Sequence, residues 1–180
     1  MELAQGFAAT SVEEICREAK LTKGSLFHYF DSKEKLGQEL LRRRCAEAGN
    51  PLTPTGRLHA DPLQRIFAAV DEAARVWSTG GGCLVGTFAQ ELSDTHPAIR
   101  SLCREAFDHW AKTMQRDLDA AKARYAPAAR IDTGELADHF IAVVEGAVIL
   151  ARARGDRRVV AVSLRHFKRY VAQLFNVRTP

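Results

Sequence analysis

The stretch that decides the fold is Thr10–Leu36, with the sequence TSVEEICREAKLTKGSLFHYFDSKEKL. Near its start, Ser11-x-x-Glu14 is a capping box. In such a box the serine side chain accepts from an amide that the helix leaves unpaired, and the glutamate bonds back to the serine amide. The pattern predicts a short helix over 11–19 that turns its apolar residues inward.

The rest of this stretch predicts two further helices. Residues 20–21 turn the chain, Thr22 caps a second short helix that runs through Phe30, and Asp31 or Ser32 caps a third. Two short helices joined by a tight turn form a helix-turn-helix, whose second helix enters the major groove of DNA with its N-terminal residues leading. The stretch therefore predicts a DNA-binding head.

Helices are predicted throughout the remaining chain. Leu63–His96 and Ala128–Thr179 contain no proline and are rich in alanine, and no segment alternates apolar and polar residues long enough for a sheet. We expect an all-α chain, with a helix-turn-helix domain and its connecting helix over 1–49 and a larger helical domain over 50–180, joined by a loop at Asn50–Gly56. Further helix starts are predicted at Asp61-Pro62, at His96-Pro97, at Asp132-x-x-Glu135 and at Asp156.

Composition excludes several classes of protein. Apolar residues make up 46% of the 180 residues, which argues against disorder, and no apolar run approaches the roughly 20 residues of a membrane span. No secretory signal follows Met1. The cysteines (Cys16, Cys45, Cys83 and Cys103) include no CxxC pair, which favours a reducing cytoplasm.

Net charge does not locate the function. The chain carries 26 basic and 22 acidic residues, a formal charge of +4, yet residues 1–49 hold eight of each. The predicted head is thus neutral. The case for DNA binding depends on where Lys23 and Lys33 stand, near helix starts, and not on bulk charge.

The head closely resembles the TetR family of bacterial repressors. The shared pattern is Gly6-Phe7, then Thr10-Ser11-Val12-Glu13-Glu14-Ile15, then Lys23-Gly24-Ser25-Leu26-Phe27-His28-Tyr29-Phe30-Asp31-Ser32-Lys33-Glu34-Lys35-Leu36. This resemblance implies a dimeric, ligand-responsive repressor that binds a palindromic DNA operator and releases it when a small inducer binds. It implies neither catalysis nor a cofactor.

The resemblance also implies which residues face DNA. Lys23 can reach guanine O6 and N7, and Gly24 lets the backbone approach the bases. Other members of the set would contact phosphates, although Tyr29 could instead be a core residue. The expected DNA-binding residues are Ser11, Lys23, Gly24, Ser25, Phe27, His28, Tyr29 and Lys33.

Three positions depart from the family pattern. Phe27 stands where tyrosine is usual, so a hydroxyl contact to phosphate is lost. Lys20 stands where glycine is usual and costs about 1 kcal/mol if its φ is positive. Only Met1–Gln5 remain of the family's first helix, so either the start lies further upstream or DNA binding is impaired.

The resemblance assigns the larger domain to dimerisation and ligand binding. The helices predicted over 135–153 and 158–175 would form a four-helix bundle with a second copy, with close approach at Ala142, Gly146, Ala147 and Ala151. An apolar or aromatic inducer would contact Trp77, Cys83, Phe88, Phe107, Trp110, Met114 and Phe140. Glu91, His109 and Glu145 could meet a polar group on it, although solvated or capped polar residues are the commoner explanation.

Cys83 has two open interpretations. The Gly80-Gly81-Gly82-Cys83-Leu84 run resembles a TetR branch in which a cysteine at a helix start responds to electrophiles, and a helix N-terminus favours thiolate. The second reactive cysteine of that branch is absent here, because Ser93 occupies that stretch. Cys83 is otherwise a small pocket or core residue.

Metal binding and catalysis find no support in the sequence. Glu135 and His139 lie one turn apart without a second such pair, and the HExxH zinc motif is absent. Cys83 and His109 could imitate a thiol dyad, but nothing in the sequence orients the histidine. We therefore expect no metal, no cofactor and no enzyme activity.

Overall fold

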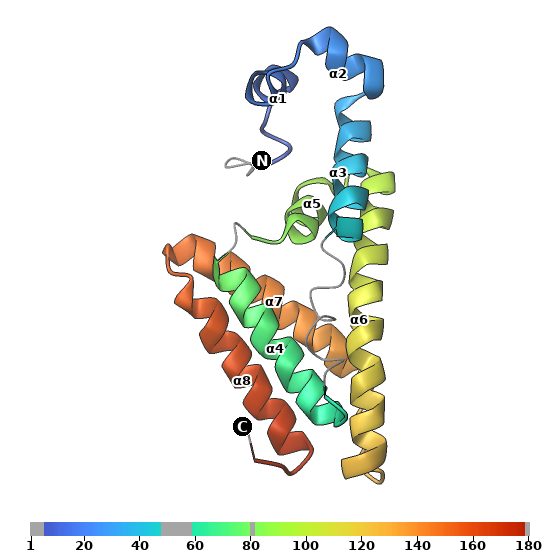
Figure 1. Ribbon diagram of the computed structural model, residues 1–180, viewed down its shortest axis with the longest axis vertical. Coiled ribbons are helices and arrows are strands. Elements are labelled where there is room, and N and C mark those ends of the chain that lie inside the picture. Colours follow the sequence, from blue (N-terminus) through green and yellow to red (C-terminus); the bar gives the residue numbers. More distant parts are fainter. Residues whose placement is uncertain (1–5, 48–58, 80–81, 179–180) are drawn as a thin grey trace. The chain divides into compact units, whose positions relative to one another are not determined.

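The computed structural model describes residues 6–47, 59–79 and 82–178. These ranges contain eight α-helices and no strand, which confirms the all-α prediction (Figure 1). Met1–Gln5 and the predicted loop at Asn50–Gly56 lie outside the described residues. The helices are α1 (Val12–Ala19), α2 (Lys23–Tyr29), α3 (Lys33–Glu47), α4 (Pro62–Thr79), α5 (Leu84–Leu92), α6 (Pro97–Tyr125), α7 (Thr133–Arg154) and α8 (Arg158–Leu174).

The chain divides into two compact units. The head unit comprises Met1–Ala48 and Leu84–Ala106, and the sensor unit comprises Gly49–Cys83 and Phe107–Pro180. The head unit therefore contains α5 and the first part of α6 in addition to the predicted 1–49 segment. Contacts between residues far apart in the sequence place α5 and the start of α6 in this unit, and local sequence patterns do not encode such contacts.

The predicted helix starts have the expected chemistry. Ser11 Oγ accepts from the Glu14 amide at 3.1 Å, and the Glu14 carboxylate accepts from the Ser11 amide at 2.7 Å, so the capping box is complete. Thr22 caps α2 by accepting from the Ser25 amide. Ser32 accepts from the Lys35 amide at the start of α3 at 3.1 Å.

Further caps lie in the sensor unit. Asp61 accepts from the Gln64 amide, and Asp132 accepts from two amides of α7. The prediction of Asp156 as the N-cap of the last helix is wrong by one residue, because the N-cap is Arg157. Asp156 still accepts from the Arg158 amide at 3.0 Å, and its pKa is lowered chiefly by the Arg158 side chain.

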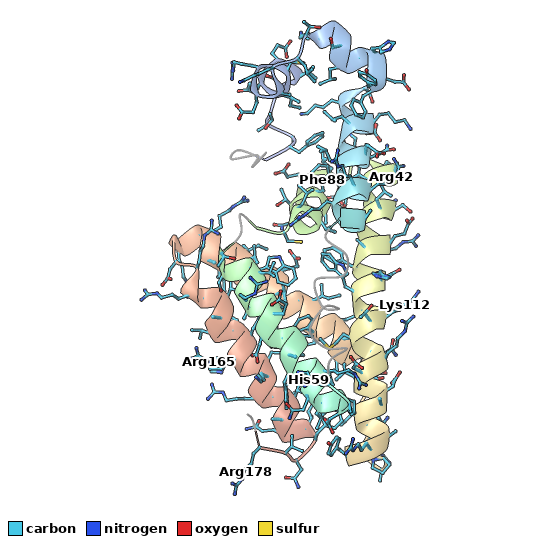
Figure 2. All side chains as sticks on the ribbon, viewed as in Figure 1. Arg42, His59, Phe88, Lys112, Arg165 and Arg178 are labelled. Atoms are coloured by element: carbon cyan, nitrogen blue, oxygen red, sulfur yellow. The ribbon has the colours of Figure 1, made fainter. Side chains whose placement is uncertain are left out.

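A small core and an aromatic contact hold the head unit together. Ile15, Cys16 and Leu26 are buried between α1 and α2, with Phe30 packed against them. On α5, Phe88 is fully buried and its ring lies 4.8 Å from that of Phe7. Figure 2 shows Phe88 beside α3, with which α5 is in contact.

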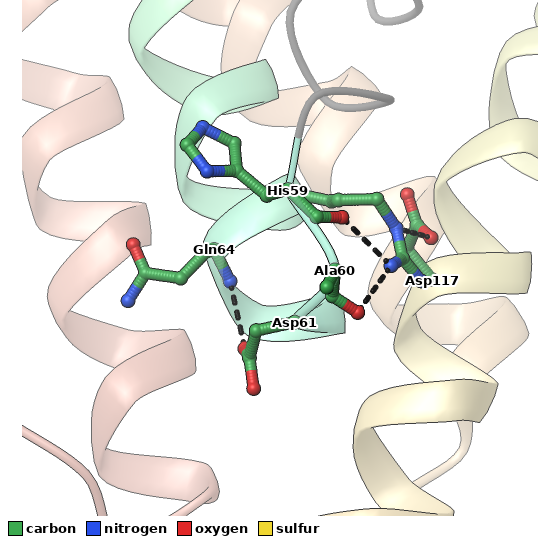
Figure 3. A network of polar contacts seen from close by, with 6 residues as sticks. His59, Ala60, Asp61, Gln64 and Asp117 are labelled. Atoms are coloured by element: carbon green, nitrogen blue, oxygen red, sulfur yellow. Dashed lines mark hydrogen bonds and ion pairs between the residues drawn. The ribbon is translucent and has the colours of Figure 1, made fainter.

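The main core lies in the sensor unit, where α8 packs against both α4 and α7 (Figure 1). Ion pairs between helices help to fasten this unit. Lys168 on α8 is almost fully buried and donates to Asp71 on α4 at 2.7 Å. Arg65 on α4 binds Asp117 on α6 at 2.6 Å and the carbonyls of His59 and Ala60 (Figure 3).

Candidate nucleic-acid interface and ligand site

The helix-turn-helix exposes the start of α2. The turn is closed by a left-handed residue, Lys20, at φ 55°, whose amide bonds back to α1. α2 then begins at Lys23, and Thr22 Oγ1 lies 3.0 Å from Ser25 Oγ. A Cβ on Gly24 would meet only Thr22 Oγ1, at 3.8 Å, so the backbone here is open to close approach.

Lys23, the predicted base reader, already has a carboxylate partner. Its Nζ forms an ion pair with Glu13 of α1, and both side chains are more than half exposed. The Lys23 side chain holds the pKa of Glu13 below its usual value. The pair links the two helices of the motif. It also places the negative charge of Glu13 beside the lysine that is predicted to contact a DNA base.

Large apolar side chains are exposed around α2. Tyr29 is 77% exposed, which argues against its alternative as a core residue, and Phe27 is 45% exposed. His28 is exposed and its ring meets Tyr29 edge-on at 5.1 Å. Leu21 in the turn is also half exposed. Exposed apolar groups at this position can contact thymine methyl groups and sugars.

Lys33 has a structural partner. Its Nζ donates to the carbonyl of Ala8 at 3.0 Å and lies 4.9 Å from the centre of the Phe7 ring. Glu91 of α5 accepts from the Ala8 amide at 2.9 Å, on the same segment. Lys33 therefore holds residues 7–8 against α3, and a phosphate would have to share it with that carbonyl.

In the sensor unit, three predicted ligand residues line one small cavity. Trp77, Trp110 and Phe140 enclose about 10 Å³ together with Ile141, Val144 and Glu145. The two indoles lie 6.3 Å apart at 62°. This volume is about that of one water-sized sphere, so the cavity holds no more than about one water molecule in this state.

The other aromatic and apolar residues predicted to bind ligand do not line this cavity. Phe107 meets Trp110 edge-on at 5.6 Å, next to the cavity. Met114 is buried in the sensor core. Phe88 packs with Phe7 in the head unit. Of the polar candidates, Glu91 binds the Ala8 amide and His109 is exposed.

Cys83 is buried and meets a carboxyl group. Its thiol donates a hydrogen bond to Glu145, whose pKa is raised because burial outweighs that bond. The four cysteines are all free. Burial also raises the pKa of Cys103 to about 11, and it raises the pKa of Cys45. Neither of these two thiols is activated toward electrophiles.

An apolar face remains on α7 and α8. A groove of about 530 Å³ lies between them, lined by residues that include His139, Gly146, Phe167 and Tyr170. Several large apolar side chains near it are more than 40% exposed: Ile149, Leu150, Val162 and Tyr170. Of the small residues predicted at the dimer contact, Ala147 and Ala151 are instead buried in the chain's own core. Ala142 and Gly146 remain accessible.

Family models match both halves of the chain. The model described as "Tetracyclin repressor-like, C-terminal domain" matches residues 62–167, and "Bacterial regulatory proteins, tetR family" matches residues 3–40. The chain belongs to the TetR family. It is thus a transcriptional regulator of the DNA-binding repressor type, as the resemblance of the head predicted.

Individual TetR proteins agree with this. The chain is 28% identical over 159 residues to the HTH-type transcriptional repressor DhaR of a Mycobacterium species, covering 86% of this chain and 78% of that protein. A TetR regulator from Chloroflexus aurantiacus has a TM-score of 0.75 at 28% identity, covering 93% of this chain and 86% of that one. CifR, a TetR regulator solved with operator DNA, shares the fold (TM-score 0.74, 22% identity, 90% and 87% covered).

Within this TetR chain, sequence reasoning missed two residues of the surface that is predicted to face DNA. Leu21 and Glu13 both stand on it, one exposed and one paired with Lys23. The position of Leu21 in the tight turn, where it cannot enter the α1–α2 core, was an available clue. Nothing in the sequence indicated that Glu13 rather than its neighbours would reach Lys23.

The described residues provide neither a cluster of metal ligands nor a membrane-spanning helix. No three His, Cys, Asp or Glu side chains of the described ranges are grouped so that they could hold a metal ion. Among the helices that the structure describes, none has the length and hydropathy that a bilayer span requires.

Proposed function

We propose that this TetR regulator binds a palindromic operator as a homodimer and leaves it when a small apolar or aromatic ligand binds the sensor unit. The observation that carries the proposal is the start of α2, where Lys23, Gly24 and Ser25 are accessible on a capped helix. Action on DNA implies a place in the cytoplasm, where free thiols stay reduced.

The DNA contacts follow from this geometry. Lys23 and Gly24 would meet base edges, with Ser25 beside them, while Ser11, His28 and Tyr29 would contact phosphates and Phe27 a sugar or methyl group. Lys33 would support the head through Ala8 and share a phosphate at most. Two heads about 34–36 Å apart would then read two half-sites.

The test is binding to DNA that flanks the protein's own gene, followed by fluorescence anisotropy at several salt concentrations. We expect specific binding that weakens by about 1–3 kcal/mol on Lys23→Ala, because a base contact is lost. Equal loss on random DNA would reassign Lys23 to a phosphate. Absence of any preference for the flanking DNA would contradict the repressor function.

The apolar face of α7 and α8 supports the homodimer. A Cβ built on Gly146 meets nothing within 4 Å in its own chain, so a side chain there starts in open space, and a large one would obstruct a second copy docked on this face. We expect Gly146→Trp to convert a dimer to monomer in analytical ultracentrifugation. Ala123→Trp, on an exposed position of α6, is the matched control and should stay dimeric. A dimeric Gly146→Trp would place the interface elsewhere.

Release would be a shift between two populations of the dimer. Ligand would favour a state in which α3, the connecting helix, spaces the heads unsuitably for the operator. A coupling of about 1–3 kcal/mol lowers DNA affinity by about 5- to 150-fold.

A second mode of release concerns Cys83. Its buried thiol is hydrogen-bonded to Glu145, which could accept the thiol proton during alkylation. In this mode Cys83→Ser would keep DNA binding and abolish release by an alkylating agent. Unchanged release would exclude it.

A further inference from the structure

The sensor unit contains a buried carboxylate oxygen that has no hydrogen-bond partner. Glu145 lies on α7 among apolar neighbours, and its Oε1 is buried without a hydrogen-bond partner. Only Ser78 Oγ shares that property among the side chains of the described residues. A buried carboxylate oxygen without a partner is costly, so the group needs an explanation, and a ligand that completes it is one.

The surroundings of Glu145 are aromatic. The rings of Trp77, Trp110 and Phe140 line the same cavity. Ring faces carry negative potential and attract cations, and trimethylated ammonium groups are bound in such aromatic cages. The Glu145 side chain adjoins these rings, so the site is complementary to a positive charge with an apolar body, and its carboxylate would repel an anion.

Trp77 lines two cavities. Trp77 also lines a neighbouring cavity of about 140 Å³, together with Gly82, Val148 and Arg152. Trp77 is thus common to the small aromatic cavity and to the larger space beside it. A ligand larger than a water molecule would need this ring to turn toward the second cavity before it could occupy the first.

We propose that Glu145 and the rings of Trp77, Trp110 and Phe140 form a binding site for an organic cation, a quaternary ammonium or protonated amine with an aromatic or aliphatic body. This rests on the proposed function and identifies the chemical class of its inducer. The cation would pair with the Glu145 carboxylate in competition with the Cys83 thiol. Burial raises the pKa of that carboxyl, so cation binding releases a proton from the fraction of Glu145 that is protonated.

Chain connectivity gives the site a path to the head. Cys83 directly precedes α5, and α5 carries Phe88 and Glu91, which hold the segment at Phe7 and Ala8. Loss of the hydrogen bond between Cys83 and Glu145 would therefore free the residue that directly precedes α5.

The test uses the protein's own fluorescence. The chain contains only two tryptophans, and both line the cavity. The full-length protein is titrated with phenyltrimethylammonium and, separately, with its neutral isostere tert-butylbenzene. We expect a saturable change with the cation, and an affinity at least about tenfold above that of the isostere, because only the cation pairs with the carboxylate.

The decisive variant is Glu145→Gln, which keeps the size of the side chain. It should lower cation affinity at least about tenfold and leave the isostere unchanged. Glu135→Gln removes the same charge from an exposed position of α7 and should behave as wild type. Circular dichroism confirms that each variant is folded.

Three results would overturn the proposal: no saturable response to the cation, equal affinity for the two probes, or cation binding that Glu145→Gln leaves intact. The readout needs no DNA, so its failure is separate from failure of the repressor function. Conversely, if the protein binds the cation but no operator, the cation site is supported and the repressor function is contradicted. Cation binding that leaves operator affinity unchanged would contradict the role as inducer.

Discussion

The ammonium of Lys23 is paired with the carboxylate of Glu13, across the turn of the helix-turn-helix. The pair is exposed, so water and salt screen it and DNA can compete for the lysine. Glu13 therefore reduces the attraction of this surface for phosphates. In the proposed complex with DNA, the pair would also orient Lys23 toward a base.

Removing the charge of Glu13 should strengthen DNA binding. We expect Glu13→Gln to raise the affinity for any DNA sequence roughly two- to fivefold at low salt, because a repulsive charge beside Lys23 is lost. Anisotropy on operator and random DNA measures both affinities. Glu18→Gln, an exposed charge on the same helix, serves as the control for net charge. An affinity that falls would mean that the pair positions Lys23 for its base.

The left-handed turn residue predicts a stabilising substitution. Lys20 has φ 55°, which glycine adopts without the strain that a Cβ causes. Lys20→Gly should raise the free energy of unfolding by about 1 kcal/mol, measured by urea denaturation. Lys35→Gly, within α3, should lower it by about 1 kcal/mol, because glycine disfavours a helix interior. Equal effects from the two would show that φ is not the cause.

Two glycines of the head unit should respond in opposite ways. A Cβ on Gly37 would lie 2.9 Å from the Phe7 ring and 3.1 Å from the Phe88 ring, so Gly37→Ala should destabilise the protein by about 1–3 kcal/mol. At Gly24 the space is open, and Gly24→Ala should fold at least as well as wild type.

Gly24→Ala should also change the affinity for DNA. The new methyl of Gly24→Ala would stand between α2 and the bases, and we expect weaker operator binding without loss of thermal stability. Melting temperature and anisotropy on the same samples check this. Unchanged operator affinity would mean that the backbone at Gly24 does not approach DNA closely.

Glu145 should make stability depend on pH. Burial raises the pKa of its carboxyl above the usual 4.5, so the folded state binds the proton more tightly than the unfolded state. Its contribution to stability is complete below 4.5 and is lost as the pH rises through the folded pKa. Glu145→Gln should lack this decline and be the more stable protein at neutral pH. Urea denaturation at a series of pH values measures the difference, and parallel curves would contradict it.

Local features of the fold could be predicted from the sequence. Caps such as Ser11, Thr22 and Asp132 act on amides two or three residues away, so their spacing along the chain encodes the helix starts. The one-residue error at Asp156 is of the same local kind. It arose because Asp156 bonds the Arg158 amide from one position before the cap.

Tertiary partners could not be predicted in this way. Lys33 was assigned to phosphate on the family pattern, yet its bond to Ala8 joins residues 25 apart. Apolar spacing marked Trp77, Trp110 and Phe140 as buried on helical faces, and these three residues line one cavity. No repeating spacing in the sequence predicts the unpaired oxygen of Glu145 or the contact between Phe88 and Phe7.

The packing of Phe7, Gly37 and Phe88 has a consequence for protein engineering. Chimeric regulators are made by joining the reading head of one protein to the sensor of another. A junction after residue 49 would keep Phe7 and discard Phe88 together with Glu91, the acceptor for the Ala8 amide. A transplantable module from this chain must therefore include the surface of α5 that faces Phe7, or the recipient must supply an equivalent one.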